Sequence, residues 1–301
     1  MRKSRMFDMV GMLLLTAVFT VLSLAAAEAA EKTFVLVHGA FGDQSVWDGP
    51  DAEQGVAEQL RQRSYRVVTV TLPGMGRNYA QSSEEIDLEA HIQHVLDVLE
   101  LDNITDATMV CHSYAGMICA AVQDRAPVNR INKMVFFDAV VPDSELGESF
   151  FDAIGMYPPN KFDSLQEFYE GNDIPVPDEN LWCFPSMPAQ AFGLTGANAD
   201  WLNLVWDAEN EKSRQHCQSI QTFAQKLNFS WNNNVKKYFV HAMDGWAFYP
   251  QFNHFRERAE ALGWNMYSIP GSHYVLISNP AAVVQLLMLI DSIPYENWPF
   301  S

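Results

Sequence analysis

Ser113 has the sequence surroundings of a nucleophile. It lies in the segment Met109–Met117, between an apolar run and a run rich in small residues. A serine on a sharp strand-to-helix turn is presented as a nucleophile, and the residues two before and two after it must be small because strand and helix pack closely there. Cys111 and Ala115 hold those positions, and both are small although neither is the usual glycine. The competing interpretation of Ser113 is a helix N-cap, which serine often forms.

Two backbone N–H groups are expected to bind the oxyanion that attack by this serine creates. A helix that starts after the serine aims the N–H of Tyr114 at the site. The second donor is expected in the segment Val35–Gly42, where an apolar run is followed by His38 and Gly39. Glycine allows a tight turn beside a substrate, which leaves the N–H of Ala40 as the donor. We interpret His38 as a structural residue that fixes this loop.

His273 is the predicted general base. It lies in the segment Gly271–Tyr274, directly after an apolar run with the pattern of a strand. Its imidazole is therefore expected in a loop at the carboxyl edge of a sheet, and an activated serine needs such a base within hydrogen-bond reach. His241, at the end of another such run, is the alternative base.

A carboxylate must orient the imidazole, and two aspartates follow predicted strands between the serine and the histidine. Asp138 follows two phenylalanines, and Asp244 lies in the segment His241–Gly245. Either one keeps the chain order serine, acid, histidine. We favour Asp244 as the acid because its strand directly precedes the strand that leads to His273, and we interpret Asp138 as a structural carboxylate at the edge of the site.

These residues stand at the ends of short apolar or β-branched runs that alternate with helical patterns. The runs span residues 33–38, 66–71, 107–111, 133–137, 238–242 and 265–269. Several of them are apolar almost throughout, as in parallel strands covered on both faces. Helices are predicted over 84–101, where the apolar residues form one stripe, over 114–125, and after Asn279-Pro280. Such alternation predicts the α/β class, with a mostly parallel open sheet and helices on both faces.

The alternation stops between residues 143 and 234, which we interpret as an insertion of helices and loops. Its tryptophans need an apolar face to cover, and the carboxyl edge of the sheet, where open α/β folds bind ligands, supplies one. The predicted domains are a core of residues 30–142 and 235–301 and a cap of residues 143–234. An apolar cap favours small to medium, uncharged, hydrophobic substrates. Its predicted lining, which plain core packing explains equally well, is Phe41, Trp182, Phe184, Trp246 and Phe248.

Residues 1–29 have the order of a secretory signal peptide. Basic residues at positions 2, 3 and 5 precede an uncharged, mostly apolar run over 9–27, and small residues follow, with cleavage expected after Ala27 or Ala29. The mature protein is then expected to be secreted or periplasmic, without stable membrane association. The alternative is a membrane anchor formed by residues 9–27, because this run is about long enough to span a bilayer.

Composition excludes several classes of partner. The chain of 301 residues has a formal net charge of −18, which repels nucleic acid and anionic membrane surfaces.

Four cysteines suit an exported protein. Cys111 and Cys119 fall in predicted buried segments, where an unpaired cysteine behaves as a small apolar residue, whereas Cys183 and Cys217 both fall in the insertion and could pair with each other. No cysteine–histidine spacing resembles a zinc site, so neither a metal nor a cofactor is expected, and oligomeric state has no sequence signal.

Residues 35–41, 111–117 and 243–273 together resemble the α/β-hydrolase superfamily. Within it they are most similar to the branch of plant methyl-ester esterases, hydroxynitrile lyases and bacterial esterase-like relatives, and the resemblance covers nearly the whole chain after residue 32. By position it implies the nucleophile, acid and base Ser113, Asp244 and His273, with Ala40 and Tyr114 as oxyanion donors. The lyases carry a lysine just after the histidine, but Tyr274 stands there, which argues for hydrolysis.

The expected activity is therefore that of a serine hydrolase that cleaves small-molecule carboxylic esters through an acyl-enzyme. A lactonase or an amidase would use the same residues. A ligand receptor on a nearly inert hydrolase site is the alternative from another class, and the absence of the usual glycines at positions 111 and 115 is the observation that favours it.

Overall fold

The computed structural model describes residues 32–83, 85–155, 181–183, 194–200, 217–244 and 252–294. Internal contacts divide the chain into two units, residues 1–32 and 33–301, and the description below concerns the second. The predicted signal segment and most of the predicted cap lie outside the described residues. No helix in the described part is long and apolar enough to cross a membrane.

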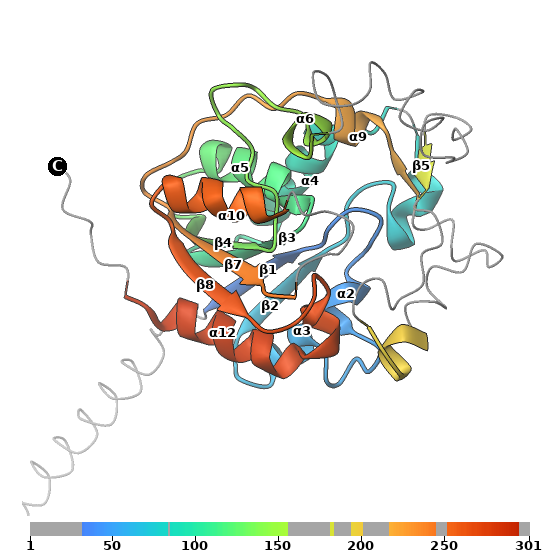
Figure 1. The fold of residues 1–301 in the computed structure, drawn as a ribbon, viewed down its shortest axis with the longest axis vertical. Helices are drawn as coiled ribbons and strands as arrows, with labels where there is room; N and C mark the ends of the chain where they lie inside the picture. Colours follow the sequence, from blue (N-terminus) through green and yellow to red (C-terminus); the bar gives the residue numbers. More distant parts are fainter. Residues whose placement is uncertain are drawn as a thin grey trace, which may run out of the picture. The chain divides into compact units, whose positions relative to one another are not determined.

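Six parallel strands form the central sheet, in the order β2-β1-β3-β4-β7-β8 (Figure 1). This confirms the predicted parallel sheet, and each predicted strand is within two residues of the observed one at either end. The strands are β1 (Thr33–Val37), β2 (Arg66–Val70), β3 (Ala107–His112), β4 (Ile131–Phe137), β7 (Lys236–Ala242) and β8 (Asn265–Ile269).

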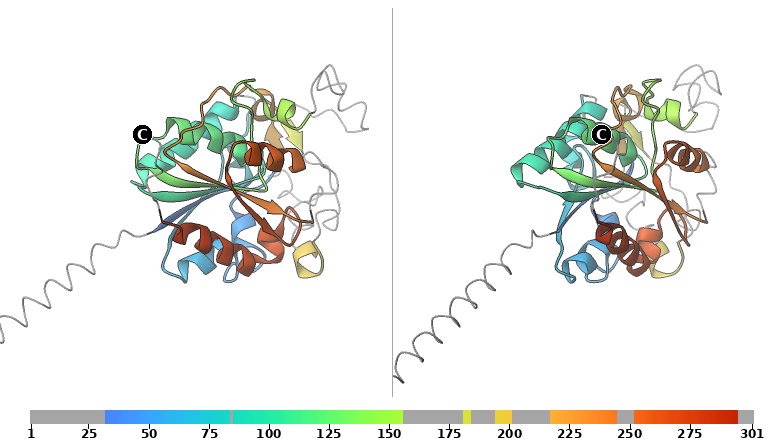
Figure 2. Two further views of the ribbon diagram at one scale, coloured as in Figure 1. Left: turned by 60° about the vertical axis from the view of Figure 1, so that its left-hand side comes forward. Right: turned by 90° about the vertical axis from the view of Figure 1, so that its left-hand side faces the viewer.

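Helices cover both faces of the sheet, as predicted (Figure 2). One face carries α4 (Leu88–Leu101), α5 (Ala115–Arg125) and α10 (Phe252–Ala261), and the other carries α3 (Val56–Arg61) and α12 (Pro280–Ser292). Successive side chains of a strand point to opposite faces. In β1, Val35 therefore joins the apolar core under α4 and α5, whereas Phe34 and Leu36 join the core under α3 and α12.

The starts of two helices follow local capping. α4 begins at Leu88 rather than at the predicted residue 84, because the side chain of Asp87 accepts a hydrogen bond from the N–H of Ala90 and acts as the N-cap. α12 begins at Pro280, where a missing N–H costs no helical hydrogen bond.

The order of the strands determines where a ligand is expected. β1 lies between β2 and β3, so the chain leaves β1 toward one side and returns on the other. Open α/β sheets bind ligands outside the carboxyl ends of the strands at this switch point. The loops that follow β1 and β3 carry Gly39 and Ser113, so the predicted site residues fall at the expected place.

Part of the predicted insertion is described. A short antiparallel pair is formed by β5 (Leu181–Cys183) and β6 (Cys217–Ser219). Its register places Cys183 opposite Cys217, and Cys217 is disulfide-bonded, which is the arrangement that the predicted pair requires. Two short helices, α6 (Phe150–Ala153) and α9 (Gln221–Ala224), also belong to this stretch.

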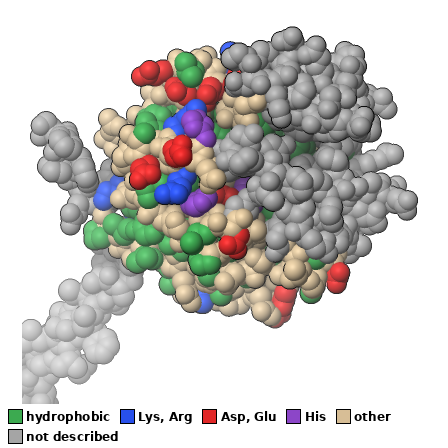
Figure 3. Space-filling model, viewed as in Figure 1, with side chains coloured by type: hydrophobic (Ala, Val, Ile, Leu, Met, Phe, Trp, Pro, Cys, Tyr) green, Lys and Arg blue, Asp and Glu red, His purple; other side chains and the backbone are tan. Residues whose placement is uncertain are grey.

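The remaining short elements are α2 (Ser45–Asp48), α11 (Val275–Ser278) and the 3-10 helix η1 (Gly76–Gln81). Acidic and basic side chains lie near one another on the described part of the face in Figure 3. In the structure, Arg258 and Glu148 form an ion pair at 2.6 Å.

Candidate active site

Ser113 occupies a sharp turn between β3 and α5. Its φ is 58°, a left-handed conformation that a residue other than glycine adopts only where the surroundings hold it. The N–H of Val140 donates to the serine carbonyl over 3.0 Å, so the chain after β4 supports this turn. The N-cap of α5 is Tyr114 rather than Ser113, which removes the capping interpretation of the serine. The strand–turn–helix order that a nucleophile elbow needs is present.

A size constraint at this elbow lies at Gly116. A Cβ on Gly116 would lie 1.9 Å from the carbonyl oxygen of Val140, so glycine alone lets α5 pack this closely against the chain after β4. The sequence analysis placed the constraint at Cys111 and Ala115, which are both fully buried. The structure adds Gly116, one position further along the helix.

Cys111 and Cys119 form a disulfide that joins β3 to α5 across the elbow. Their Cα atoms are 6.5 Å apart, within the usual range for a disulfide. Both cysteines are buried, as predicted, but they are bonded to each other rather than being unpaired apolar residues. Cys111 lies on β3 and Cys119 on α5, and the turn at Ser113 brings these two elements together. The spacing of the two cysteines in the sequence does not by itself predict this proximity.

The loop after β1 approaches the serine closely at Gly39. A Cβ on Gly39 would lie 2.8 Å from the Cβ of Ser113, so this position needs glycine. His38 holds the loop: its Nε2 accepts from the N–H of Leu72 at 3.1 Å and its Nδ1 lies 2.8 Å from the carbonyl oxygen of Gly39. Since Nε2 is the acceptor, the proton is on Nδ1 and donates to that carbonyl. His38 is therefore the structural histidine that the sequence analysis expected.

His273 and Asp138 form a buried pair. Nδ1 of His273 lies 2.6 Å from Oδ2 of Asp138, and the two residues are 2% and 1% exposed. The carboxylate is further held by the N–H of Ala242, which donates to Oδ1 over 3.3 Å. Nδ1 of His241 lies 3.5 Å from the same oxygen. Asp138 thus stands between two imidazoles.

The surroundings of Asp138 favour its charged form. Burial by itself raises the pKa of the carboxyl group, but the imidazoles of His241 and His273 and the N–H of Ala242 outweigh burial and hold the pKa below its ordinary value of 3.8. The carboxylate therefore stays ionised at neutral pH. An ionised acid on Nδ1 of His273 fixes the tautomer in which Nε2 is the basic nitrogen.

The prediction that Asp244 is the acid is wrong in this structure. Asp244 is exposed, and its described contact is made by the backbone, whose N–H donates to the carbonyl of Gly271 over 3.0 Å. The physical reason is the order of the strands: β4, which leads to Asp138, lies directly beside the strand of Ser113, whereas β7, which leads to Asp244, lies one strand further away. A signal was present in the sequence: a carboxylate in the run Phe136–Val141 must be buried, and a buried carboxylate needs a partner.

His112 links the serine to the histidine loop. Its Nε2 lies 2.9 Å from the carbonyl oxygen of His273, and its ring centroid lies 4.4 Å from that of His273. Burial lowers the pKa of His112 well below its ordinary value of 6.5, so the ring is neutral and donates through Nε2. The residue before Ser113 thus fixes the backbone of the predicted base.

The two predicted oxyanion donors, the N–H groups of Ala40 and Tyr114, make no hydrogen bond within the described residues, where both are therefore without an acceptor. The neighbouring N–H of Phe41, in contrast, donates to Oε1 of Gln218 at 3.2 Å. Tyr114 is fully buried, and its hydroxyl lies 3.1 Å from Nδ1 of His91.

The predicted aromatic lining is described at one of its five positions. Phe41 is 7% exposed and packs in the core, with its ring centroid 5.4 Å from that of Phe223. The other four, whose side chains lie outside the described part of the chain, are Trp182, Phe184, Trp246 and Phe248. Within the described residues, no group of three or more histidine, cysteine or acidic side chains could hold a metal ion.

Comparison with known proteins agrees with the fold. Residues 34–286 match the model of the alpha/beta hydrolase family. A carbendazim-hydrolysing esterase from Nocardioides sp. (strain SG-4G) is 30% identical over 259 residues, which cover 84% of this chain and 97% of the relative.

Solved structures of low sequence identity share the fold. An extracellular α/β-hydrolase from a Paenibacillus species has a TM-score of 0.63 at 19% identity, with 86% of this chain and 98% of that chain covered. A pyrethroid hydrolase from Sphingobium faniae JZ-2 has a TM-score of 0.62 at 17% identity, with 88% and 99% covered.

Proposed function

Because the chain belongs to the α/β-hydrolase family, we propose that it is a serine hydrolase that cleaves carboxylic esters of small to medium, uncharged, hydrophobic substrates through an acyl-enzyme. The observation that carries the proposal is the left-handed turn at Ser113 directly after His112, whose ring centroid lies 4.4 Å from that of His273 in its buried pair with ionised Asp138. We assign Ser113 as the nucleophile, His273 as the base and Asp138 as the acid.

The first half of the reaction forms an ester between the enzyme and the acyl group. Nε2 of His273 takes the proton of the Ser113 hydroxyl while the serine oxygen bonds to the substrate carbonyl carbon. The carbonyl oxygen becomes an oxyanion that accepts hydrogen bonds from the N–H groups of Ala40 and Tyr114. The tetrahedral adduct then breaks its bond to the alkoxy group, which leaves as the alcohol with the proton from His273.

The second half repeats these steps with water. The same imidazole removes a proton from water as its oxygen attacks the acyl carbon, and the bond to Ser113 breaks when the serine regains a proton. Asp138 stabilises the imidazolium in both halves and remains a carboxylate. Loss of one oxyanion donor typically costs about 3 kcal/mol of transition-state stabilisation.

Two observations support the substrate class, one from the charge of the chain and one from similar proteins. Its net charge of −18 disfavours anionic substrates by long-range repulsion. Two similar proteins are named for the hydrolysis of carbendazim and of pyrethroids. A panel of neutral aromatic and aliphatic esters is therefore the first choice, with carbendazim, a pyrethroid, lactones and amides as additional members that define the preferred bond.

The test compares two buried serines. Ser113→Ala is expected to abolish hydrolysis of a chromogenic short-chain ester and to prevent labelling by a fluorophosphonate. Ser272→Ala is the matched control, because Ser272 is 7% exposed and its hydroxyl is buried without a described hydrogen-bond partner. We expect this variant to keep activity and labelling. Wild-type binding of a ligand without measurable turnover on the panel would instead favour a receptor.

We also propose that residues 1–29 direct export and are removed. The order of basic, apolar and small residues in this segment supports the proposal. Intact-mass measurement of the protein recovered outside the cytoplasm tests it. A mass that still includes residues 1–29, on protein found in the membrane fraction, would favour an anchor.

A further inference from the structure

The loop that carries the Ala40 donor is tied to a distant part of the chain. The N–H of Phe41 donates to Oε1 of Gln218 over 3.2 Å, although 177 positions separate these residues. Phe41 has a φ of 57°, which a residue other than glycine keeps only where its surroundings hold it. The side chain of Gln218 is part of that support, since it satisfies the N–H next to the predicted donor.

The carboxamide of Gln218 is itself held on its other side. Its Nε2 donates to Oγ1 of Thr222 over 2.7 Å, and that hydroxyl donates to the carbonyl of Ser219 over 2.6 Å. Gln218 is 1% exposed and Thr222 is fully buried. Oε1 and Nε2 of Gln218 are therefore both hydrogen-bonded, which fixes the orientation of the side chain.

The same short segment also contacts the second oxyanion residue. The hydroxyl of Tyr114 donates to the carbonyl of Thr222 over 3.3 Å. The ring of Phe223 packs between the two loops, with its centroid 5.3 Å from that of Tyr114 and 5.4 Å from that of Phe41. Residues 218–223 thus touch Tyr114, which carries one predicted donor, and Phe41, which follows the other.

We propose that Gln218 is a positioning residue for the oxyanion hole, because its carboxamide holds the Phe41 N–H and Thr222, and through them the spacing between the Ala40 and Tyr114 donors. The inference rests on the proposed function, because an oxyanion forms only if Ser113 attacks a carbonyl group. Gln218 does not touch the reacting atoms. It acts through the backbone of the loop after β1.

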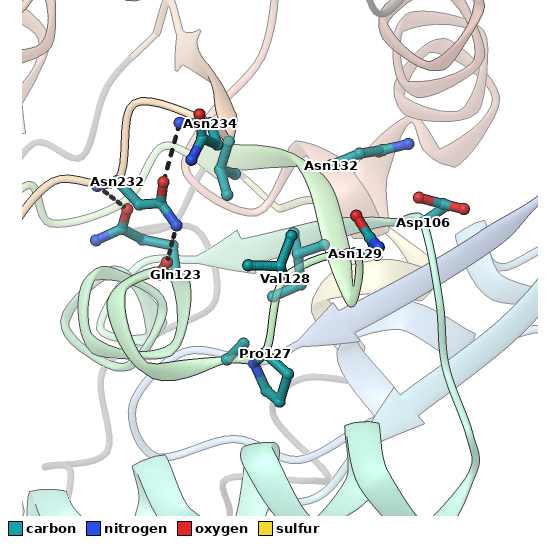
Figure 4. Close-up of a pocket in the computed structure, with 11 residues that line it drawn as sticks. Asp106, Gln123, Pro127, Val128, Asn129, Asn132, Asn232 and Asn234 are labelled. Carbon is teal, nitrogen blue, oxygen red and sulfur yellow. Dashed lines mark hydrogen bonds between the residues drawn. The ribbon is translucent and has the colours of Figure 1, made fainter.

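A second buried glutamine supplies a matched control. Gln123 is also 1% exposed. Its Nε2 donates to the carbonyl of Ser230 and its Oε1 accepts from the N–H of Asn232, at 2.7 and 2.6 Å. It lines a cavity of about 190 Å³ beside the start of β4 (Figure 4). The cavity is therefore at the amino ends of the strands, whereas Ser113 follows the carboxyl end of β3. Figure 4 shows the bond to Oε1 and a second one, in which the side-chain amide of Asn232 donates to the backbone carbonyl of Gln123 over 3.1 Å. Gln123 therefore matches Gln218 in burial, but it lies far from the predicted oxyanion hole.

The experiment uses the whole chain and replaces each glutamine by methionine, which keeps the length of the side chain and removes its hydrogen bonds. Gln218→Met is expected to lower kcat for the chromogenic ester by about 10-fold to 100-fold with KM within about 2-fold, because a donor displaced from its position weakens transition-state binding. The inhibition constant of a trifluoromethyl ketone, whose carbonyl Ser113 attacks to form an oxyanion, should rise by a similar factor. Gln123→Met should change neither quantity, whatever it does to Tm.

Thr222→Val provides an independent variant of the same shape as the natural residue. It removes the acceptor of the Gln218 amide and is expected to lower kcat in the same direction but by a smaller factor. The double variant with Gln218→Met should lose no more than Gln218→Met alone, since both changes interrupt one path. If Gln218→Met fails to fold, Thr222→Val alone must show the paired change in kcat and inhibition constant.

The outcomes separate this inference from the proposed function. Wild-type activity that depends on Ser113, together with unchanged kcat and inhibition constant in the Gln218 and Thr222 variants, would overturn the positioning role and leave the hydrolase assignment intact. Activity that survives Ser113→Ala would overturn the assignment itself. Equal losses in the Gln218 and Gln123 variants would show a general effect of buried amides and contradict the inference.

Discussion

Nδ1 of His273 lies 2.6 Å from Oδ2 of Asp138, across 135 positions of sequence. In the register of β3 with β4, His112 is paired with Phe137, so Ser113 and Asp138 are the residues that follow one cross-strand pair. Both have positive φ values, 58° and 43°, and both turn out of their strands at the same level. The proposed nucleophile and the proposed acid are therefore placed by two adjacent strands, and His273 comes from the loop after β8.

The first prediction concerns the choice of acid. Asp138→Asn is expected to lower kcat by about 10⁴-fold, because an amide at this position supports the wrong tautomer of His273. Asp244→Asn should stay within about 2-fold of wild type, since the exposed carboxylate has no described contact with the site and its backbone N–H is kept. Steady-state kinetics on one ester, with Tm as a check on folding, measures both variants. The reverse ranking would return Asp244 to the triad.

The second prediction concerns the close approach of two loops. Gly39→Ala would place a methyl group 2.8 Å from the Cβ of Ser113, so the loop with the Ala40 donor must move. We expect kcat to fall about 100-fold. Gly42→Ala in the same loop is the control, because its methyl group would meet its nearest neighbour, Val46, at an ordinary 3.5 Å. Similar kinetics for the two variants would contradict the argument.

The third prediction concerns the disulfide across the elbow. Replacement of both Cys111 and Cys119 by alanine is expected to lower the free energy of unfolding by about 2–3 kcal/mol, because the cross-link no longer restricts the unfolded chain. Denaturant titration under non-reducing conditions measures this change. Peptide mapping of the unreduced wild-type protein is the control, and it should recover the two cysteines in one cross-linked fragment. Free thiols at both positions would contradict the bond.

The fourth prediction concerns stability at acid pH. Burial lowers the pKa of His91 from 6.5 to about 3, so the unfolded chain binds a proton between these pH values that the folded chain does not. The free energy of unfolding should therefore fall as the pH is lowered from about 6.5 toward 3, by up to about 1.4 kcal/mol per pH unit from this residue, with no such contribution above pH 6.5.

His91→Gln tests this sign. The amide can still donate to the carbonyl of Pro73, which lies 3.0 Å from Nε2 of the imidazole, but it does not titrate. Denaturant titrations from pH 4 to pH 7 should give a shallower dependence for the variant. Parallel slopes for wild type and variant would show that His91 does not titrate in this way.

The sequence predicted the sheet well because its central strands are buried on both faces. In β4, Met134 and Phe136 join one core while Val135 and Phe137 join the other, so the second half of this strand is a continuous apolar run. The elbow followed from the same pattern, since Ser113 separates a buried strand from a helix of small residues. These features are local, and a single sequence is enough to find them.

The acid and the cross-link could not be fixed in the same way. Whether Asp138 or Asp244 reaches His273 depends on the order of the strands in the sheet, which connects residues far apart in the chain. The bond between Cys111 and Cys119 depends on the angle of the turn at Ser113. The contact of Gln218 with Phe41 bridges 177 positions, and no periodicity marks a residue whose role is to satisfy one remote N–H.

Asp138 precedes residue 143 in the sequence, so the predicted insertion of residues 143–234 does not lie between Ser113 and Asp138. The proposed nucleophile and acid are both encoded before the predicted insertion, on paired strands, and the proposed base is encoded after it. If these roles hold, changes in the length or composition of residues 143–234 would alter which molecules are accepted without separating Ser113 from Asp138. The stretch around Gln218 would be the exception, because its proposed positioning role links the insertion to the rate of the reaction.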